Sequence, residues 1–300
     1  MLWTSIFSHF TSRPKRLIRP LGGLLLTLPM LVSLTGVRQP AFAQALLPYT
    51  LQVDSEHLQQ TGEGLIEEAA QLTRFQQYQL ALPRAELATQ LAPNNYQTWA
   101  LLGSLYIQVD RTEAGIEALN RAQALAPDNP AIRFVLGEAY FRKGEYQRSV
   151  EQIQQGLRIN PNVPGALFDL GNAYFQLGQF EQAIAQYEEA YKQERLLWPA
   201  INNIGLVEYE LGKTDSAVQR WEEAFAIDET AAEPLLAIAV ALYQQGDTER
   251  ALTLGEQALQ LDSRYAELEF LRENLWGDRL MEDARTFLST PRMRQTISRL

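Results

Sequence analysis

The chain has 300 residues, of which 46% are apolar, and a formal net charge of −10. The first 43 residues hold five basic and no acidic side chains, so the remainder carries −15. Such an acidic body repels phosphate backbones, which argues against nucleic acid as a general partner. The chain contains no cysteine, which excludes disulfides, iron–sulfur clusters and thiolate metal sites.

Residues 1–43 have the pattern of an export signal. A basic stretch from Arg13 to Arg19 precedes an apolar run, residues 21–37, and Ala41-Phe42-Ala43 is a small-residue cleavage site before Gln44. Because the basic residues precede the apolar run, the body is expected on the far side of the membrane from the cytosol. We expect a cleaved signal peptide. The alternative is an uncleaved membrane anchor at residues 21–37. Residues 44–61 are expected to be a short linker, with docking as a helix as the alternative.

Six blocks of 34 residues then follow without a gap: 62–95, 96–129, 130–163, 164–197, 198–231 and 232–265. A fixed period of this length predicts a stack of helical hairpins. The eighth, twentieth and twenty-seventh residues of every block are small, which lets facing helices approach closely. The first block departs most from the pattern, with Pro83 inside its second helix.

Glycine and proline mark the expected helix ends. Glycine stands at the turn within four blocks, at Gly144, Gly178, Gly212 and Gly246. There it can take a positive φ and end the first helix. Proline ends the second helix in three blocks, at Pro93, Pro127 and Pro161. The last three blocks have Arg195, Glu229 and Ser263 at that place, so we expect their second helices to run further.

The motifs Leu136-Gly137-x-x-Tyr140 and Leu170-Gly171-x-x-Tyr174 are spaced as in the tetratricopeptide repeat. The chain resembles that family over about two thirds of its length. The resemblance implies an all-α fold, a right-handed α-solenoid of helix-turn-helix hairpins. A C-terminal capping helix is expected at 266–277. Residues 278–300 are expected to form a short helix and a basic tail, whose end is frayed.

In proteins of this family, the first helices of successive repeats line a concave groove that binds a peptide or another protein. Carried over to this chain, the partner-binding groove consists of Phe134, Phe141, Phe168, Asn172, Phe175, Asn202, Leu206, Tyr209, Val240 and Tyr243. The large rings offer contact area and the amides can bond an extended backbone. The alternative is that the rings pack between repeats. If they line the groove, Phe168→Ala with Phe175→Ala abolishes partner capture and leaves the fold nearly intact.

Some relatives clamp the C-terminal carboxylate of a chaperone with lysine, asparagine and arginine at fixed places. Asn172 and Asn203 match the two amide places. The lysine and arginine places hold Phe168, Glu233 and Ala237, so binding of chaperone tails is disfavoured.

The sequence has no pattern typical of an active site. It contains no P-loop, GxGxxG, HExxH or EF-hand motif, and its only histidines are His9 and His57. Adjacent carboxylates such as Glu188-Glu189 lie on expected helices, where neighbours point about 100° apart. We therefore expect no enzyme, and no catalytic residue, cofactor or metal.

The expected function is a non-catalytic scaffold that binds a protein or peptide and assists assembly or stability of a membrane-associated complex. The expected location is the periplasm or the thylakoid lumen. Gln-rich, Lys-poor helices and the Ala-Phe-Ala-Gln signal are similar to exported repeat proteins of cyanobacteria, some of which assist pigment-enzyme or photosystem biogenesis. One alternative is an envelope factor for polysaccharide export or outer-membrane assembly. Another is an enzyme, or the regulatory subunit of one.

Overall fold

The computed structural model describes residues 54–300, which contain helices and turns but no strand. The expected export signal and the start of the expected linker lie outside the described residues. Within 54–300, every helix is too short or too polar to cross a bilayer.

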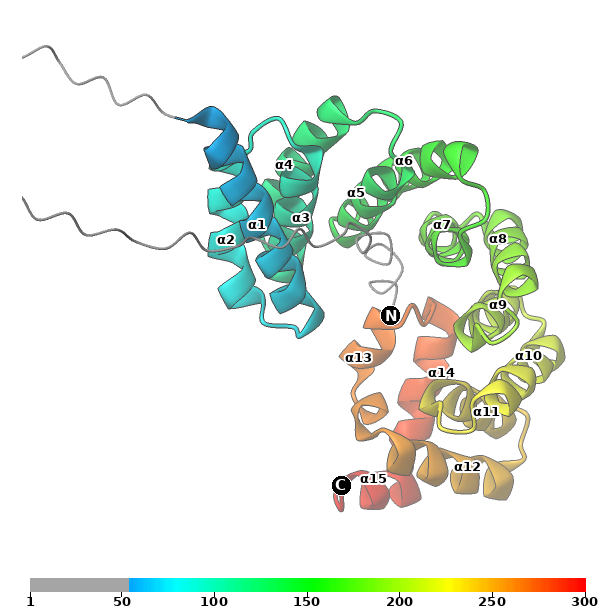
Figure 1. The fold of residues 1–300 in the computed structure, drawn as a ribbon. Helices are drawn as coiled ribbons and strands as arrows, with labels where there is room; N and C mark the ends of the chain where they lie inside the picture. The colour runs from blue at the N-terminus through cyan, green and yellow to red at the C-terminus, as the bar shows by residue number, and fades with distance from the viewer. Residues whose placement is uncertain (1–53) are drawn as a thin grey trace, which may run out of the picture. The chain divides into compact units, whose positions relative to one another are not determined.

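The described chain is built from helical hairpins that follow one another in sequence (Figure 1). From α3 onward each hairpin packs its two helices together, and successive hairpins pack side by side. In the first hairpin, Gly62 lies against Leu91 and Arg84 pairs with Glu68 at 3.2 Å. The paired helices are α1 (Ser55–Arg74) and α2 (Tyr78–Leu91), α3 (Tyr96–Gln108) and α4 (Thr112–Leu125), α5 (Pro130–Arg142) and α6 (Tyr146–Ile159), α7 (Pro164–Gln176) and α8 (Phe180–Gln193), α9 (Trp198–Glu210) and α10 (Thr214–Ile227), and α11 (Ala232–Gln244) and α12 (Thr248–Leu261).

The first helices α3, α5, α7, α9 and α11 begin at the first residues of the 34-residue blocks. Helix α1 differs, because it begins at Ser55 rather than Gly62. The Asp54 carboxylate accepts the backbone N–H of Glu56 at 3.1 Å and so satisfies a donor at the start of this helix. The end of the segment expected to be a linker is therefore helical.

The turns inside the hairpins have the predicted backbone conformation. Gly144, Gly178, Gly212 and Gly246 have φ of 74°, 69°, 79° and 91°, values that glycine adopts without steric cost. The expected lengthening of the last three second helices is wrong. Helices α8, α10 and α12 have 14 residues each, as α4 and α6 do. The chain turns at the same place without proline, because the next first helix must begin in register to pack against its neighbours.

Glycines in the first helices face large side chains in the second helices. A Cβ added at Gly171 would lie 2.5 Å from Cε1 of Tyr187, and one at Gly205 would lie 2.5 Å from Nε1 of Trp221. Tyr187 and Trp221 are fully buried. The small residues of the repeat therefore make room for rings as well as for close helix approach.

The last part of the chain, residues 263–300, folds back onto the array and is called the C-terminal segment below. It contains a short 3₁₀ helix η2 (Ser263–Ala266) and helices α13 (Leu268–Glu273), α14 (Asp278–Leu288) and α15 (Pro291–Ile297). Helix α14 packs against the first helices α9 and α11, and α15 packs against α12 (Figure 1). The capping helix expected over 266–277 is therefore shorter, because α13 spans only Leu268–Glu273. The longer helix α14, further along the chain, covers the array.

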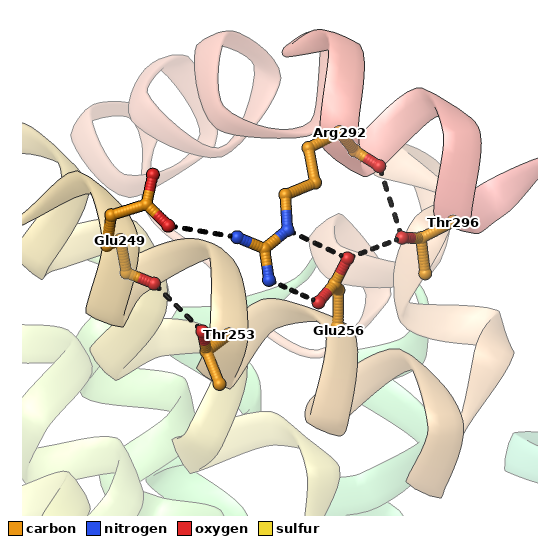
Figure 2. Close-up of polar contacts among 5 residues, drawn as sticks. All are labelled: Glu249, Thr253, Glu256, Arg292 and Thr296. Carbon is orange, nitrogen blue, oxygen red and sulfur yellow. Dashed lines mark hydrogen bonds and ion pairs between the residues drawn. The ribbon is translucent and has the colours of Figure 1, made fainter.

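The tail expected to be frayed is docked as helix α15. Figure 2 shows Arg292 between Glu249 and Glu256 of α12: its guanidinium donates two hydrogen bonds to Glu256, at 3.0 and 2.8 Å, and one to Glu249 at 3.2 Å. Paired donation to one carboxylate is a strong form of ion pair. Met293 beside it is fully buried. The tail is ordered because its basic residue has a matching acidic partner.

Candidate protein-binding face

The first helices of the hairpins share one face, called the first-helix face below, and the ten predicted binding residues lie on these helices. Phe134, Phe141, Phe168, Asn172 and Phe175 belong to α5 and α7, and Asn202, Leu206, Tyr209, Val240 and Tyr243 belong to α9 and α11. The structure separates the two groups, because the C-terminal segment lies on the second group alone.

Four of the five predicted residues on α9 and α11 are buried and the fifth, Tyr243, is half-buried, which corrects the expectation of one open groove. Asn202, Tyr209 and Val240 are 0% exposed and Leu206 is 1% exposed. The Tyr243 ring packs edge-on against Phe287 of α14, with centroids 5.5 Å apart. Residues 200–209 and 232–242 are buried without interruption, so α9 and α11 are enclosed on all sides. A helix that is buried all round belongs to the core of a protein.

Glu210 of α9 holds the beginning of α14. Its carboxylate accepts the backbone N–H groups of Arg279 at 3.1 Å and Leu280 at 3.0 Å. A negative charge at this place also complements the positive end of the helix dipole. Gly277 packs directly on the Glu210 side chain, where an added Cβ would collide with it. Glycine before the start of α14 therefore leaves room for the Glu210 carboxylate that caps this helix.

Tyr209 makes the second polar connection between α9 and α14. Its hydroxyl donates to the Asp283 carboxylate at 2.6 Å, and the Arg279 guanidinium lies 4.6 Å from its ring centre and donates to its backbone oxygen at 2.8 Å. Burial, followed by the hydrogen bond to Asp283, raises the pKa of Tyr209 above its ordinary value. The docked helix is thus held by specific polar contacts as well as by apolar packing.

Glu233 of α11 is buried under the C-terminal segment, with 6% of its surface exposed. The indole N–H of Trp276 donates to one of its oxygens at 3.1 Å, and the hydroxyl of Tyr265 donates to the other at 3.5 Å. Burial raises the pKa of Glu233 to about 7, although its hydrogen bonds to Trp276, Asn202 and Tyr265 favour the charged form.

On α5 and α7, two of the predicted rings fill space inside their own hairpins. Phe134 lies against Gly156 of α6, where an added Cβ would meet the ring. Phe168 packs against Tyr187 of α8 with ring centroids 5.6 Å apart. Both rings remain partly exposed. They therefore contribute to packing and still present an edge to solvent.

The other two rings pack at the turns of the same hairpins. Phe141 contacts Tyr146 with centroids 5.3 Å apart, and Phe175 contacts Phe180 at 5.7 Å. Phe175 is 8% exposed. Because removing a buried phenylalanine side chain costs about 3–5 kcal/mol, the structure contradicts the expectation that Phe168→Ala with Phe175→Ala leaves the fold nearly intact.

The amides at the places of the chaperone clamp bind within the molecule. Asn172 accepts hydrogen bonds from the Tyr187 hydroxyl at 2.8 Å and from the Asn203 side chain at 3.0 Å. The Asn203 oxygen in turn accepts from Asn202 at 3.2 Å. This amide chain connects α7 to α9.

Two acidic side chains, Glu138 of α5 and Asp169 of α7, were not predicted from the sequence as part of the binding face. Asp169 stands three residues before Asn172, so the two share a helix face. Burial and the nearby charge of Glu138 raise the pKa of Asp169. Glu138 pairs with Arg142 at 2.9 Å, whereas Asp169 has no ion pair with another residue of 54–300. The spacing from Asn172 was the signal that could have identified Asp169.

Within 54–300, no three His, Asp or Glu side chains are grouped so as to hold a metal ion. A pocket of about 550 Å³ lies between α6, α7 and α8, lined by residues that include Leu157, Arg158, Tyr174 and Glu189. None of the ten predicted binding residues lines it.

Within 54–300, six helical hairpins follow one another, which defines a helical-repeat protein. Residues 50–194 match the family described as the cytochrome c-type biogenesis protein H TPR domain. Residues 205–246 match a TPR repeat family, and 235–261 match a tetratricopeptide repeat family. The chain is a tetratricopeptide repeat protein, as the spacing of its motifs predicted.

Solved structures share the fold. The pilF protein of Pseudomonas aeruginosa is 15% identical and superposes with a TM-score of 0.60 over 73% of this chain and 99% of its own. Cut9–Hcn1 of the APC/C is 15% identical, with a TM-score of 0.60 over 77% of this chain and 46% of that one. MamA is 24% identical, with a TM-score of 0.50 over 54% of this chain and 94% of its own. No curated protein sequence matches this chain. At these identities the likeness is one of fold.

Proposed function

We propose that this protein is a non-catalytic scaffold that binds a segment of another protein on the first-helix face of α3, α5 and α7. One observation carries the proposal: on α9 and α11 the same face already holds a polypeptide segment, helix α14. That helix is bound by the capping carboxylate of Glu210, the hydroxyl of Tyr209 and the ring of Tyr243. A face built in this way is suited to bind protein, and its upstream part has no described segment of the chain docked along it.

The side chains on α5 and α7 favour a partner segment that carries a positive charge and an apolar residue. Asp169 and Glu138 supply negative charge on this face, and the partly exposed edges of Phe134 and Phe168 supply apolar contact. A lysine or arginine between the two carboxylates would relieve their mutual repulsion. The partner is therefore expected to present a basic, amphipathic segment.

We also propose that the protein acts outside the cytosol, in the periplasm or thylakoid lumen, and assists assembly or stability of a membrane-associated complex. The export pattern of residues 1–43 supports the location. The match of residues 50–194 to a cytochrome c-type biogenesis TPR domain supports an assembly role. We expect the mass of the protein isolated from its host to correspond to a chain that begins at Gln44. A mass that includes Met1 would contradict cleavage.

Partner capture from detergent-solubilised host membranes tests the binding face. We expect Glu138→Gln with Asp169→Asn to weaken capture by about tenfold or more, because a hydrogen bond to a charged group contributes about 1.5–3 kcal/mol. The measurement is the amount of each co-purifying protein, identified by mass spectrometry, as a function of bait concentration.

The matched control is Glu117→Gln with Glu181→Gln, which removes two exposed carboxylates from the second helices α4 and α8. This control is expected to capture as much partner as the unmodified protein. Equal losses in both variants would show that total charge, rather than this face, governs binding. No loss in either variant would place the partner elsewhere on the molecule. Photosynthetic or cytochrome-assembly partners would support the proposed role, whereas export machinery would support the alternative.

A further inference from the structure

The C-terminal segment covers the part of the first-helix face that lies on α9 and α11, and the centre of this contact is a buried acid. Glu233 lies under Trp276 and Tyr265, both of which come from the C-terminal segment. The neighbouring amide of Asn202, on α9, is itself fully buried, and the side-chain oxygen of Asn202 has no hydrogen-bond donor. The hydrogen bond from Asn202 to Glu233 favours the charged form, so burial without a neighbouring cation is what favours the protonated form.

No cation neutralises Glu233 among the described residues. It is the only charged residue of α11, and the ionisable groups of the elements packed around it are engaged elsewhere. On α9, Glu208 pairs with Arg220 and Glu210 caps α14. Near η2, Arg264 pairs with Asp262, and on α14, Asp283 and Arg279 contact Tyr209.

The remaining charges are turned to solvent or to other helices. Exposed charges in and beside α13 and α14 include Glu267, Glu269, Arg272, Glu273, Asp278, Glu282 and Arg285. From α10 and α12, Glu222 pairs with Arg250, Glu223 with Arg220, Asp215 accepts from Gln245, and Glu249 and Glu256 bind Arg292. The titratable group that faces Glu233 directly is the Tyr265 hydroxyl, whose pKa is raised by burial and by Glu233.

We propose that the C-terminal segment is a proton-controlled cover: protonation of Glu233 holds α13 and α14 on the face of α9 and α11, and its ionisation favours their release. A buried carboxylate without a cation is costly, whereas the same group is hydrated once the segment leaves. Release would extend the first-helix face from α7 to α11 and uncover Leu206, Tyr209 and Val240. The consequence for partner binding rests on the proposed function; the opening itself does not.

The direction of the pH effect follows from the two states of the carboxyl. Its ordinary pKa is 4.5, and in the covered state it is about 7. Because the pKa is raised on burial, the stabilisation of the cover is complete below about pH 4.5 and is lost as the pH rises through about 7. Between about pH 6 and about pH 8, linkage predicts that the open-to-covered ratio rises by about tenfold. Both pH values, about 6 and about 8, lie above the sequence pI of about 4.9, so the chain keeps its net negative charge.

Hydrogen–deuterium exchange of the intact protein, followed by mass spectrometry on peptides of α13 and α14, tests this cover without any partner. Glu233→Gln is the decisive variant, because it keeps the shape of the side chain and cannot ionise. Dividing the exchange of the unmodified protein by that of Glu233→Gln at the same pH removes the intrinsic pH dependence of exchange. We expect this ratio to rise by about tenfold between about pH 6 and about pH 8 for α14, and to stay constant for α5 and α7.

Glu256→Gln is the matched control, because Glu256 also anchors the C-terminal segment but is paired with Arg292, which lowers its pKa. We expect faster exchange of α15 in this variant to the same extent at both pH values. If Glu233→Gln does not fold, Trp276→Phe replaces it: an aromatic ring stays at this place, the indole N–H donor to the carboxylate is lost, and the opening should shift to higher pH. A constant ratio for α14, or a rise shared by α5 and α7, would overturn the proposal. Either result leaves the partner-capture experiment unaffected.

Discussion

We expect Phe287→Ala to lower the free energy of unfolding by about 3–5 kcal/mol, as for other buried aromatic side chains truncated in a core. Phe287 is fully buried although it stands on α14, outside the repeats. Its ring packs on Tyr243 of α11 and fills the space that Gly255 of α12 leaves open. The substitution would leave a cavity between three helices. Urea denaturation followed by circular dichroism gives the free energy.

Phe75→Ala is the control for this experiment, because the same side chain is removed from a site that is 68% exposed. We expect it to change the free energy of unfolding by no more than about 0.5 kcal/mol. A Phe287→Ala protein as stable as the Phe75→Ala protein would mean that α14 does not belong to the folded body. The covered state of α9 and α11 would then be wrong.

The second large effect is expected for Trp221→Ala in α10, again about 3–5 kcal/mol. The indole is fully buried and lies over Gly205, and its N–H donates to the backbone oxygen of Asn202 at 3.1 Å. Its ring also packs against Tyr209, with centroids 5.7 Å apart. Tyr209 is the residue that binds Asp283 of α14. We therefore expect the C-terminal segment to loosen as well, measured as faster amide exchange in α14.

The control is Leu196→Ala in the loop between α8 and α9, where the side chain is 78% exposed. It is expected to leave both the free energy of unfolding and the exchange of α14 unchanged within about 0.5 kcal/mol. If Trp221→Ala destabilises the protein but the amides of α14 exchange no faster, the contact between Tyr209 and Trp221 does not couple the stability of α10 to the docking of the C-terminal segment. If stability is unchanged, the glycine-to-ring pairing is not a source of stability in this array.

The repeat array could be predicted from sequence because its signals are local and recur. Gly178 and Gly212 mark turns where the chain takes a positive φ, and the period places Gly171 and Gly205 against Tyr187 and Trp221. Each of these features acts within one hairpin or between neighbours. A repeated pattern therefore strengthens the prediction at every copy.

The proposed binding face was predicted only in part. The period correctly placed Phe168, Asn172 and Phe175 on one first helix, but it could not decide how exposed each would be. Phe175 is buried because Phe180 meets it at the turn, and Asn172 is engaged because Tyr187 and Asn203 happen to face it. Asp169, which now supplies charge to the proposed face, was identified only from the structure.

The sequence by itself determined the helical-repeat fold, because spacing and small residues within 34-residue blocks specify how each hairpin forms and stacks. Only the tertiary structure decided which part of the first-helix face is covered. Tyr209 meets Asp283 across 74 residues of sequence, and Glu233 meets Trp276 across 43. Those contacts depend on complementary side chains that occur once each. No period signals them, so folding of the whole body brings them together.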